Sequence, residues 1–313
     1  MATMRAMSQD ELGGPELLKE VRIDRPVPGP SEVLVRVHAA GMNSSDWKHR
    51  KSPGFLGRLP LVLGWDVSGV VESVGVGVSL HRVGEEVFGM LPYPHGHGAF
   101  AEYVVAPARA LVRKPAGLDH TRAAAIPLAA LTARQALVDT ADIQPGQRVL
   151  IHAAAGGVGH IAVQIAKSLG AHVIGTASAA KHDALRALGA DELVDYRTED
   201  FEAAVSGVDV VIDLIGGDYA ARSLRTLRKG GVVVSLVLSN TRALTETAAE
   251  LGVRHQLMLV ESDQAGMLAV AELVEAGSLR PVIEAAFPLE RAAKAHELGD
   301  TGGVSGKLVL TVR

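Results

Sequence analysis

Residues 148–169 read RVLIHAAAGGVGHIAVQIAKSL, which predicts a strand, a glycine turn and a helix in succession. The apolar run at 148–152 is typical of a buried strand, and apolar residues recur at helical spacing from Ile161 onward. Between them, residues 153–159 have the spacing A-x-x-G-x-x-G, a variant of the dinucleotide-binding pattern G-x-G-x-x-G. An Ala/Gly-rich helix start would have a similar composition. The flanking strand and helix favour a dinucleotide site instead.

Each position of this turn has a physical role in that interpretation. Gly156 allows the turn to tighten and the backbone to approach a pyrophosphate, and Gly159 allows the helix to pack closely on the strand. The helix N-terminus then offers free N–H groups and a partial positive charge to the phosphates. We therefore expect the cofactor to contact Ala154, Gly156, Gly157, Val158 and Gly159.

The end of the next predicted strand, at 172–176, indicates which nicotinamide cofactor binds. An NAD-preferring site ends this strand with an acidic residue that binds the ribose 2′-OH. Here Thr176 is followed by Ser178 and Lys181, and no acidic residue occurs before Asp183. A hydroxyl and an ammonium can bind a 2′-phosphate that a carboxylate would repel. We predict NADP(H) bound near these three residues, the alternative for Lys181 being a solvated lysine in the first turn of the next helix.

Composition and charge exclude several classes of protein. The chain has 313 residues, 48% of them hydrophobic and 21% charged, which is typical of a globular protein large enough for two domains. A net charge of −4 without a basic run argues against nucleic acid or an anionic membrane as partner. The absence of cysteine excludes disulfides, a catalytic cysteine and thiolate zinc sites. Asp10 and Glu11 near the start, and no apolar segment there, lead us to expect no secretory signal and a cytoplasmic location.

The apolar pattern divides the chain into two parts. Residues 1–127 contain short apolar runs separated by Gly and Pro, which predict antiparallel strands in a curled barrel. From residue 128, a helix to residue 140 is followed by alternating strands and helices, the pattern of a doubly wound parallel sheet. The predicted strands lie at 149–152, 173–176, 193–195, 208–214, 231–236 and 256–260, and the helices at 158–169, 179–188, 219–227 and 266–276. The helix at 289–298 and the strand at 306–312 are too few for a domain, so we expect them to rejoin the N-terminal part.

Several motifs, in this order, resemble those of the medium-chain dehydrogenase/reductase superfamily, specifically its zinc-free quinone oxidoreductase branch. The resemblance covers nearly the whole chain. It is carried by GGPELL at 13–18, PGPSEVLV at 28–35, AAGMNSSD at 39–46, LGWDVSG at 63–69, the turn at 153–159, LGADELVDY at 188–196 and GKLVL at 306–310.

The resemblance implies an α/β protein of two domains. One is a GroES-like catalytic domain with a partly open β-barrel, which we place at 1–127 and 279–313. The other is a Rossmann NADP-binding domain with a doubly wound parallel sheet, which we place at 128–278. It further implies NADPH-dependent reduction of quinones or α,β-unsaturated carbonyl compounds, and a homodimer. Zinc-dependent relatives use a cysteine ligand, and this chain has none.

Asn43 and Asp46 match the family's N-x-x-D element, which implies that they face the nicotinamide. Asn43 could donate its amide N–H to the substrate carbonyl or to the nicotinamide ribose, and Asp46 could orient the loop. An Asx-type turn that closes a β unit is the alternative, especially for Asp46. We interpret Asp66, also at a family position, as structural. His95 and His97 form an H-x-H pair without a third ligand nearby, so we predict a solvated loop and no metal site.

The resemblance also implies further cofactor contacts in the second domain. Thr132 would approach the nicotinamide or a phosphate, and Tyr196 would flank the 2′-phosphate. Ile215 and Leu236 follow the fourth and fifth predicted strands and would lie beside the cofactor. The alternatives are an ordinary helix threonine for Thr132 and an aromatic cap on the sheet edge for Tyr196.

The reaction implied is hydride transfer from the nicotinamide to an electron-poor carbon, with negative charge developing on the substrate carbonyl oxygen. A proton then comes from water or from a hydroxyl that the sequence does not identify. The small number of aromatic residues slightly favours small enones over large quinones. The alternative is an NADPH-binding protein with a regulatory or structural role, which NADPH turnover would distinguish.

Overall fold

The computed structural model describes residues 2–52, 54, 56, 59–96, 98–237 and 241–313. Contacts divide the chain into two compact units. The first unit contains Met1–Leu131, Glu261–Gly277 and Pro281–Arg313, and the second contains Thr132–Val260 and Ser278–Arg280. No helix in the described part of the chain is long and apolar enough to cross a membrane.

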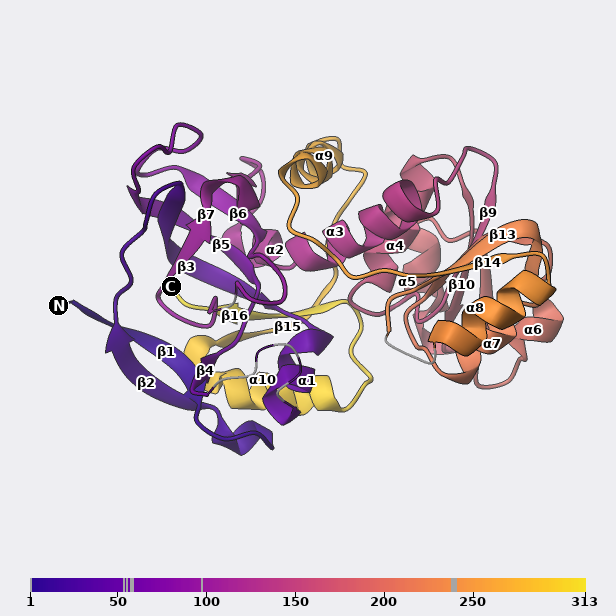
Figure 1. Ribbon diagram of the computed structural model, residues 1–313, viewed down its shortest axis with the longest axis horizontal. Helices are drawn as coiled ribbons and strands as arrows, with labels where there is room; N and C mark the ends of the chain where they lie inside the picture. The colour runs from indigo at the N-terminus through magenta and orange to yellow at the C-terminus, as the bar shows by residue number, and fades with distance from the viewer. Residues whose placement is uncertain (1, 53, 55, 57–58, 97, 238–240) are drawn as a thin grey trace. The chain divides into compact units, whose positions relative to one another are not determined.

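The second unit is built on a six-stranded sheet whose strands are all parallel. Its order is β11-β10-β9-β12-β13-β14, which is the 3-2-1-4-5-6 order of a Rossmann fold (Figure 1). This confirms the predicted fold class. The strands are β9 (Arg148–Ile151), β10 (His172–Ala177), β11 (Glu192–Asp195), β12 (Val208–Asp213), β13 (Leu227–Ser235) and β14 (Arg254–Leu257).

Helices alternate with these strands, and their apolar sides close the core. Leu150, Ile174, Val211 and Val233, on four neighbouring strands, belong to one buried cluster. The helices are α4 (Gly159–Ser168), α5 (His182–Ala187) after the 3₁₀ turn Ala179–Lys181, α6 (Phe201–Ala204), α7 (Asp218–Ser223) and α8 (Thr241–Glu250). The predicted helix at 219–227 was too long, because β13 already begins at Leu227.

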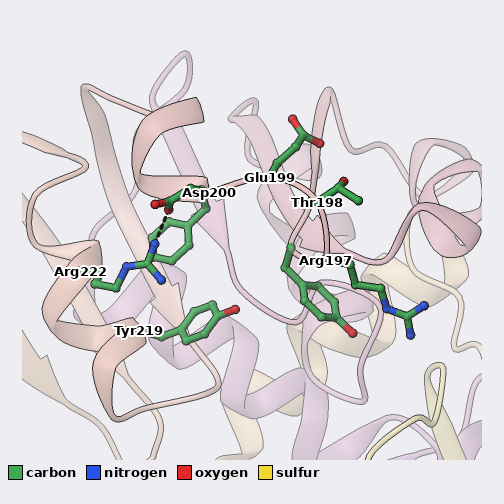
Figure 2. A pocket seen from close by; sticks show the side chains of 8 residues that line it. Arg197, Thr198, Glu199, Asp200, Tyr219 and Arg222 are labelled. Carbon is green, nitrogen blue, oxygen red and sulfur yellow. Dashed lines mark hydrogen bonds and ion pairs between the residues drawn. The ribbon is translucent and has the colours of Figure 1, made fainter.

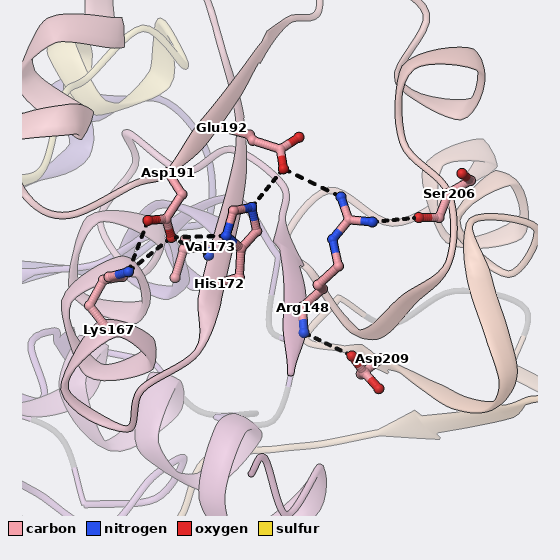
Figure 3. Close-up of polar contacts among 8 residues, drawn as sticks. All are labelled: Arg148, Lys167, His172, Val173, Asp191, Glu192, Ser206 and Asp209. Atoms are coloured by element: carbon pink, nitrogen blue, oxygen red, sulfur yellow. Dashed lines mark hydrogen bonds and ion pairs between the residues drawn. The ribbon is translucent and has the colours of Figure 1, made fainter. Parts of the chain in front are cut away.

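A polar network joins the amino ends of three of the parallel strands (Figure 3). Glu192 Oε1 lies 2.6 Å from His172 Nε2 and 3.4 Å from Arg148 Nη2. The carboxylate of Asp191 accepts from Val173 N at 2.7 Å and pairs with Lys167 Nζ at 2.9 Å. These side chains are partly exposed, so each pair contributes little to stability. They give partners to backbone N–H groups and charged side chains at the amino edge of the sheet, opposite the glycine turn.

The first unit contains a seven-stranded sheet and a small three-stranded sheet. In the larger sheet, β16 pairs antiparallel with β3 and parallel with β15, so the C-terminal segment forms part of this unit. The larger sheet contains β3 (Glu32–Met42), β5 (Asp66–Val74), β6 (Glu86–Met90), β7 (Tyr103–Pro107), β8 (Leu111–Arg113), β15 (Ile283–Pro288) and β16 (Lys307–Thr311). The smaller sheet contains β1 (Thr3–Gln9), β2 (Lys19–Asp24) and β4 (Leu61–Val62).

The helices of the first unit include one that the sequence placed elsewhere. The predicted helix at 266–276 is α9 (Gln264–Glu275), which contacts β8 and falls in the first unit. The predicted Rossmann domain, residues 128–278, wrongly included this helix. Ser262 Oγ donates to Met90 O at 2.8 Å just before this helix begins. The other helices are α1 (Ser44–Lys51), α2 (His120–Ala124) and α10 (Ala292–Asp300). Helix α3 (Pro127–Arg134) begins in the first unit, and from Thr132 it and the π-helix that continues it (Gln135–Thr140) belong to the second unit.

His152, which follows β9, is fully buried and neutral in the second unit. Its ring nitrogens lie 3.2 Å from Thr176 Oγ1 and 2.9 Å from Ser223 Oγ. Its ring meets Phe201 edge-on, with centroids 4.7 Å apart. Burial lowers the pKa of His152 to about 4. The unfolded chain therefore binds more protons than the folded protein below about pH 6.5, so this group reduces stability as the pH falls toward 4.

Replacing His152 with Gln should make the protein less sensitive to acid. Glutamine can still hydrogen-bond to Thr176 and Ser223, but it does not titrate. Between pH 7 and pH 5 the parent should lose about 2 kcal/mol more unfolding free energy than the variant. Urea denaturation across this range measures the difference. His95→Gln, at an exposed position, is the control and should follow the parent. Parallel curves for the parent and His152→Gln would contradict the expectation.

Candidate active site

The glycine turn lies at the carboxyl end of β9, where the strand order reverses between β9 and β12. This switch point is where open α/β sheets bind their ligands. Ala153 has a left-handed φ of 47°, and the turn closes with Gly156 N donating to Ala153 O at 2.8 Å. Ala154 N donates to Thr176 O at 3.0 Å, which ties the turn to the end of β10.

Glycine is required at position 159 because the helix start approaches the turn closely. A Cβ there would lie 2.4 Å from Ala153 O and 2.8 Å from Ala154 Cα. The N–H groups of Gly157 and Val158 have no hydrogen-bond partner in the described part of the chain, and both residues are half-buried. Unpaired N–H groups at the start of a helix can bind an anionic group, so the turn fits the pyrophosphate of a dinucleotide.

The predicted cofactor residues Ser178, Lys181 and Tyr196 follow two neighbouring strand ends. Ala177 of β10 pairs with Asp195 of β11, so Ser178 and Tyr196 emerge from adjacent positions on the sheet edge. Lys181 N donates to Ser178 O at 2.9 Å within the short 3₁₀ turn that follows β10. Ser178 is buried, whereas the Tyr196 side chain is about half exposed.

Thr176 is hydrogen-bonded to the glycine turn. Its Oγ1 accepts from Ala153 N at 3.2 Å and lies 3.2 Å from His152 Nδ1, and Thr176 itself is buried. The sequence predicted a cofactor contact for Thr176, and the geometry shows a side chain committed to the protein. His152 is a supporting residue that sequence reasoning missed. A polar residue at the end of an apolar strand was its only signal.

Ile215 and Leu236 are both held by Asp213, the first by its buried carboxylate and the second by its backbone carbonyl. Asp213, at the end of β12, accepts through Oδ1 from Ile215 N at 3.0 Å and Gly216 N at 2.8 Å. Its Oδ2 accepts from Ser235 Oγ at 3.1 Å, and its backbone carbonyl accepts from Leu236 N at 3.0 Å. The loop after β12 and the end of β13 are therefore fixed to each other, and the sequence analysis did not identify Asp213. Thr132, the remaining predicted cofactor residue, is buried in α3.

A hollow of about 280 Å³ opens beside Tyr196, between the loop after β11 and the start of α7 (Figure 2). Arg222 is bonded to Asp200 and lies over the Phe201 ring, with Cζ 4.5 Å from its centroid. Arg197 is exposed, and its guanidinium makes no hydrogen bond or ion pair with the residues the structure describes. Arg197 thus adds an accessible cation next to Tyr196, which the sequence analysis did not identify.

In the first unit, Asp46 anchors the turn between β3 and α1. Its Oδ2 accepts from Asn43 N at 2.6 Å, and its Oδ1 accepts from Gly64 N at 3.0 Å. Asp46 is fully buried, and burial raises its pKa to about 7 against the opposing effect of these N–H groups and of Lys307. The bond from Asn43 N is that of a capping box, with Asn43 at the N-cap of α1 and Asp46 three residues later, and it differs from the Asx-type turn that we considered for Asp46.

Asn43 belongs to a buried polar cluster, the Lys307 network, formed by Asn43, Asp46, Asp66 and Lys307. Asn43 Nδ2 donates to Asp66 Oδ2 at 2.9 Å, and Lys307 Nζ donates to Asn43 Oδ1 and lies 3.4 Å from Asp66 Oδ2. Leu128 N donates to Asp66 Oδ1 at 2.7 Å. Burial lowers the pKa of Lys307 and raises that of Asp66.

This network bears on the predicted catalytic role of Asn43. One amide N–H and the amide oxygen are already committed to buried partners, and the residue is 7% exposed. The role of Asn43 in the reaction stays a prediction. Sequence reasoning noted the GKLVL motif but did not connect its lysine with Asn43, which lies 264 positions away.

No three His, Cys, Asp or Glu side chains gather as metal ligands within the described ranges, and His97 lies outside them.

Comparisons with known proteins agree with this architecture. The family model described as the alcohol dehydrogenase GroES-like domain matches residues 29–116, and the one described as zinc-binding dehydrogenase matches residues 188–310. A 2-haloacrylate reductase of Burkholderia is 36% identical over 95% of this chain and 96% of its own. Human quinone oxidoreductase is 32% identical over 98% of this chain and 97% of its own.

The chain is also similar to solved structures. A quinone oxidoreductase from Coxiella burnetii is 39% identical, with a TM-score of 0.95 over 100% of both chains. The Escherichia coli quinone oxidoreductase complexed with NADPH is 28% identical, with a TM-score of 0.88 over 99% of this chain and 100% of that one.

The fold, the glycine turn and these likenesses define an NAD(P)H-dependent oxidoreductase. The chain belongs to the medium-chain dehydrogenase/reductase superfamily, in its quinone oxidoreductase branch.

Replacing Lys307 with Met should destabilise the protein strongly, because the buried Asp66 carboxylate would lose its cation. The expected loss is roughly 3–5 kcal/mol of unfolding free energy, measured by chemical denaturation. Adding Asp66→Asn should recover part of this loss, since no unpaired charge then stays buried. Lys294→Met, in an exposed pair with Glu297, is the control and should change stability by about 0.5 kcal/mol or less. A Lys307→Met effect as small as the control's would show that the network is not stabilising.

Proposed function

We propose that the protein uses NADPH to reduce quinones or α,β-unsaturated carbonyl compounds by hydride transfer, without zinc. The observation that carries this proposal is the convergence of binding groups on one edge of the parallel sheet. The unpaired N–H groups of residues 157–158 lie at the end of β9, and Ser178, Lys181 and Tyr196 follow β10 and β11. No carboxylate follows β10 before Asp183.

The preference for NADPH follows from charge. A ribose 2′-phosphate carries negative charge that the ammonium of Lys181 and the hydroxyl of Ser178 can bind. The accessible guanidinium of Arg197 adds a second cation one residue beyond Tyr196. At the opposite end of the cofactor, the backbone around Ile215 and Leu236 is fixed by Asp213 and can orient the nicotinamide. When bound, NADPH supplies the hydride.

The proposal of a zinc-free reaction has two supports. The chain has no cysteine, so it cannot form the thiolate ligand of its zinc-dependent relatives. In the Lys307 network, the positive charge beside Asn43 and Asp66 comes from a lysine ammonium. Hydride addition to a conjugated system requires stabilisation of negative charge on the carbonyl oxygen, and a positioned hydrogen-bond donor can provide it.

The substrate class is supported by what the names of the relatives have in common. A quinone and a 2-haloacrylate both contain an electron-poor carbon–carbon double bond conjugated with a carbonyl or carboxylate group. Such a bond accepts hydride at the carbon remote from that group. We therefore propose small enones and simple quinones as substrates. The homodimer implied by the resemblance and the cytoplasmic location expected from the N-terminal sequence stay predictions.

Parallel assays of NADPH oxidation with short enones, nitroalkenes and quinones test the proposed function. We expect turnover with at least one class of conjugated acceptor, and we expect it to survive dialysis against a strong chelator. Saturated ketones and aldehydes serve as controls and should not be reduced. Cofactor binding without turnover on any acceptor would favour a regulatory or structural protein. Loss of activity on dialysis and its restoration by zinc would contradict the zinc-free reaction.

Replacing Lys181 with Ala should mainly weaken NADPH binding. Loss of a charge-assisted contact with the 2′-phosphate is expected to reduce affinity by about 1–3 kcal/mol while leaving NADH affinity nearly unchanged. Fluorescence titration with both cofactors measures this split. Lys229→Ala is the matched control, because this exposed lysine lies near the amino end of β13, at the other edge of the sheet. Equal affinity of the parent for NADPH and NADH would refute the preference.

A further inference from the structure

A continuous series of hydrogen bonds, which we call the His152 chain, joins the glycine turn to helix α7. Ala153 N donates to Thr176 Oγ1 at 3.2 Å, and the same hydroxyl oxygen lies 3.2 Å from His152 Nδ1. On the other side of the ring, His152 Nε2 lies 2.9 Å from Ser223 Oγ, which donates to Tyr219 O at 2.6 Å. All of these residues belong to the second unit.

The direction of each bond in the His152 chain follows from the carbonyl group at its end. A carbonyl oxygen can only accept, so the Ser223 hydroxyl donates its hydrogen to Tyr219 O and must accept from His152 Nε2–H. Burial lowers the pKa of His152 to about 4, so the ring is neutral at pH 7 and carries its single proton on Nε2. Nδ1 is therefore an acceptor for the Thr176 hydroxyl, whose oxygen in turn accepts from Ala153 N.

The residue of the glycine turn that the His152 chain holds has a strained backbone. Ala153 has a left-handed φ of 47°, a conformation that is costly for a residue with a Cβ and that glycine adopts freely. Its N–H is bonded to Thr176, and its carbonyl accepts from Gly156 N at 2.8 Å. Strained residues persist only where the surrounding structure holds them, so loss of the bond to Thr176 would favour relaxation of Ala153.

The carbonyl group of Ala153 determines where α4 begins. It accepts from Gly156, and it lies so close to Gly159 that a Cβ there would be 2.4 Å from its oxygen. The N–H groups of residues 157 and 158, between these two contacts, make no hydrogen bond with the residues the structure describes. Their direction therefore depends on the conformation of Ala153, and so does their fit to a pyrophosphate.

We propose that His152 is a positioning residue for the cofactor. Through Thr176 it holds Ala153 in the left-handed conformation, and this directs the unpaired N–H groups of the turn toward the pyrophosphate. The inference rests on the proposed function, because it concerns the same cofactor. His152 does not itself bind a phosphate, since its two ring nitrogens are bonded to Thr176 and Ser223 and the side chain is fully buried. The pyrophosphate is common to NADPH and NADH, so His152 affects the binding of both.

Fluorescence titration of the whole chain with NADPH and with NADH tests this role. His152→Phe keeps a ring against Phe201 and Tyr219 but removes both hydrogen bonds, and it should weaken the binding of each cofactor by about tenfold or more. His152→Gln again offers one acceptor and one donor, and it should stay within about threefold of the parent. Adding Ala153→Gly to His152→Phe should restore most of the affinity, because glycine adopts the left-handed conformation without support.

Two further variants keep the test decisive if His152→Phe is poorly folded. Thr176→Val retains the shape of the side chain but leaves Ala153 N without its partner, so it should weaken both cofactors as His152→Phe does. Thr176→Ser keeps the hydroxyl and should bind both like the parent. Leu244→Ala, which truncates a buried core residue on α8 of the same unit, is the control for stability. It should lower the melting temperature and leave both affinities unchanged.

Other results would overturn the inference. Unchanged affinity in both His152→Phe and Thr176→Val would show that the turn does not need the His152 chain. A loss that Ala153→Gly does not restore would show that His152 acts on the fold of the sheet edge and not through Ala153. A loss confined to NADPH would place the effect at the 2′-phosphate, as expected for Lys181→Ala. If the parent protein binds neither cofactor, the proposed function itself fails.

Discussion

The first unit depends on one buried cation. Lys307 is 2% exposed and has its ammonium bonded to Asn43 and close to Asp66. Removing these groups from water is costly, and the cost is offset only if every charge keeps its partners. Through this contact, β16 at the end of the chain is joined to the β3–α1 turn and to β5, while the bond from Leu128 N to Asp66 adds the start of α3. A conformation that separates these segments would leave a charge buried alone.

The second unit follows the same physical rule, because its buried polar groups also have partners within the protein. Parallel strands end in buried polar positions, and backbone N–H groups there need partners. Thr176 and His152 support the turn after β9, and Asp213 holds the backbone after β12 and β13. The carboxyl edge of the sheet is thus held by hydrogen bonds within the second unit. The half-buried N–H groups of residues 157–158 are left for a ligand.

Much of this arrangement could be predicted from local patterns. Buried strands, the glycine turn and the C-terminal strand have strong signals in apolar runs and glycine spacing. Local sequence patterns did not predict the features that depend on a contact between residues far apart in the sequence. Helix α9 has an ordinary amphipathic sequence, and only its packing on β8 assigns it to the first unit. Likewise, no residue near Asn43 in the sequence indicates its bond to Lys307. Helix α1 was not predicted either, because its residues are mostly polar and form no apolar stripe.

The hydrogen bonds at the β3–α1 turn show which polar groups already have partners in the protein and which could still bind a ligand. A side chain whose donors and acceptors already have buried partners can act on a substrate only by giving one of them up. Asp46 is in that position, since its two oxygens accept from Asn43 N and Gly64 N, whereas Asn43 keeps a second amide N–H that makes no hydrogen bond with the described residues. The contacts of Asp46 therefore build the turn, and the second amide N–H of Asn43 and the buried Ser45 hydroxyl keep hydrogen-bonding capacity there.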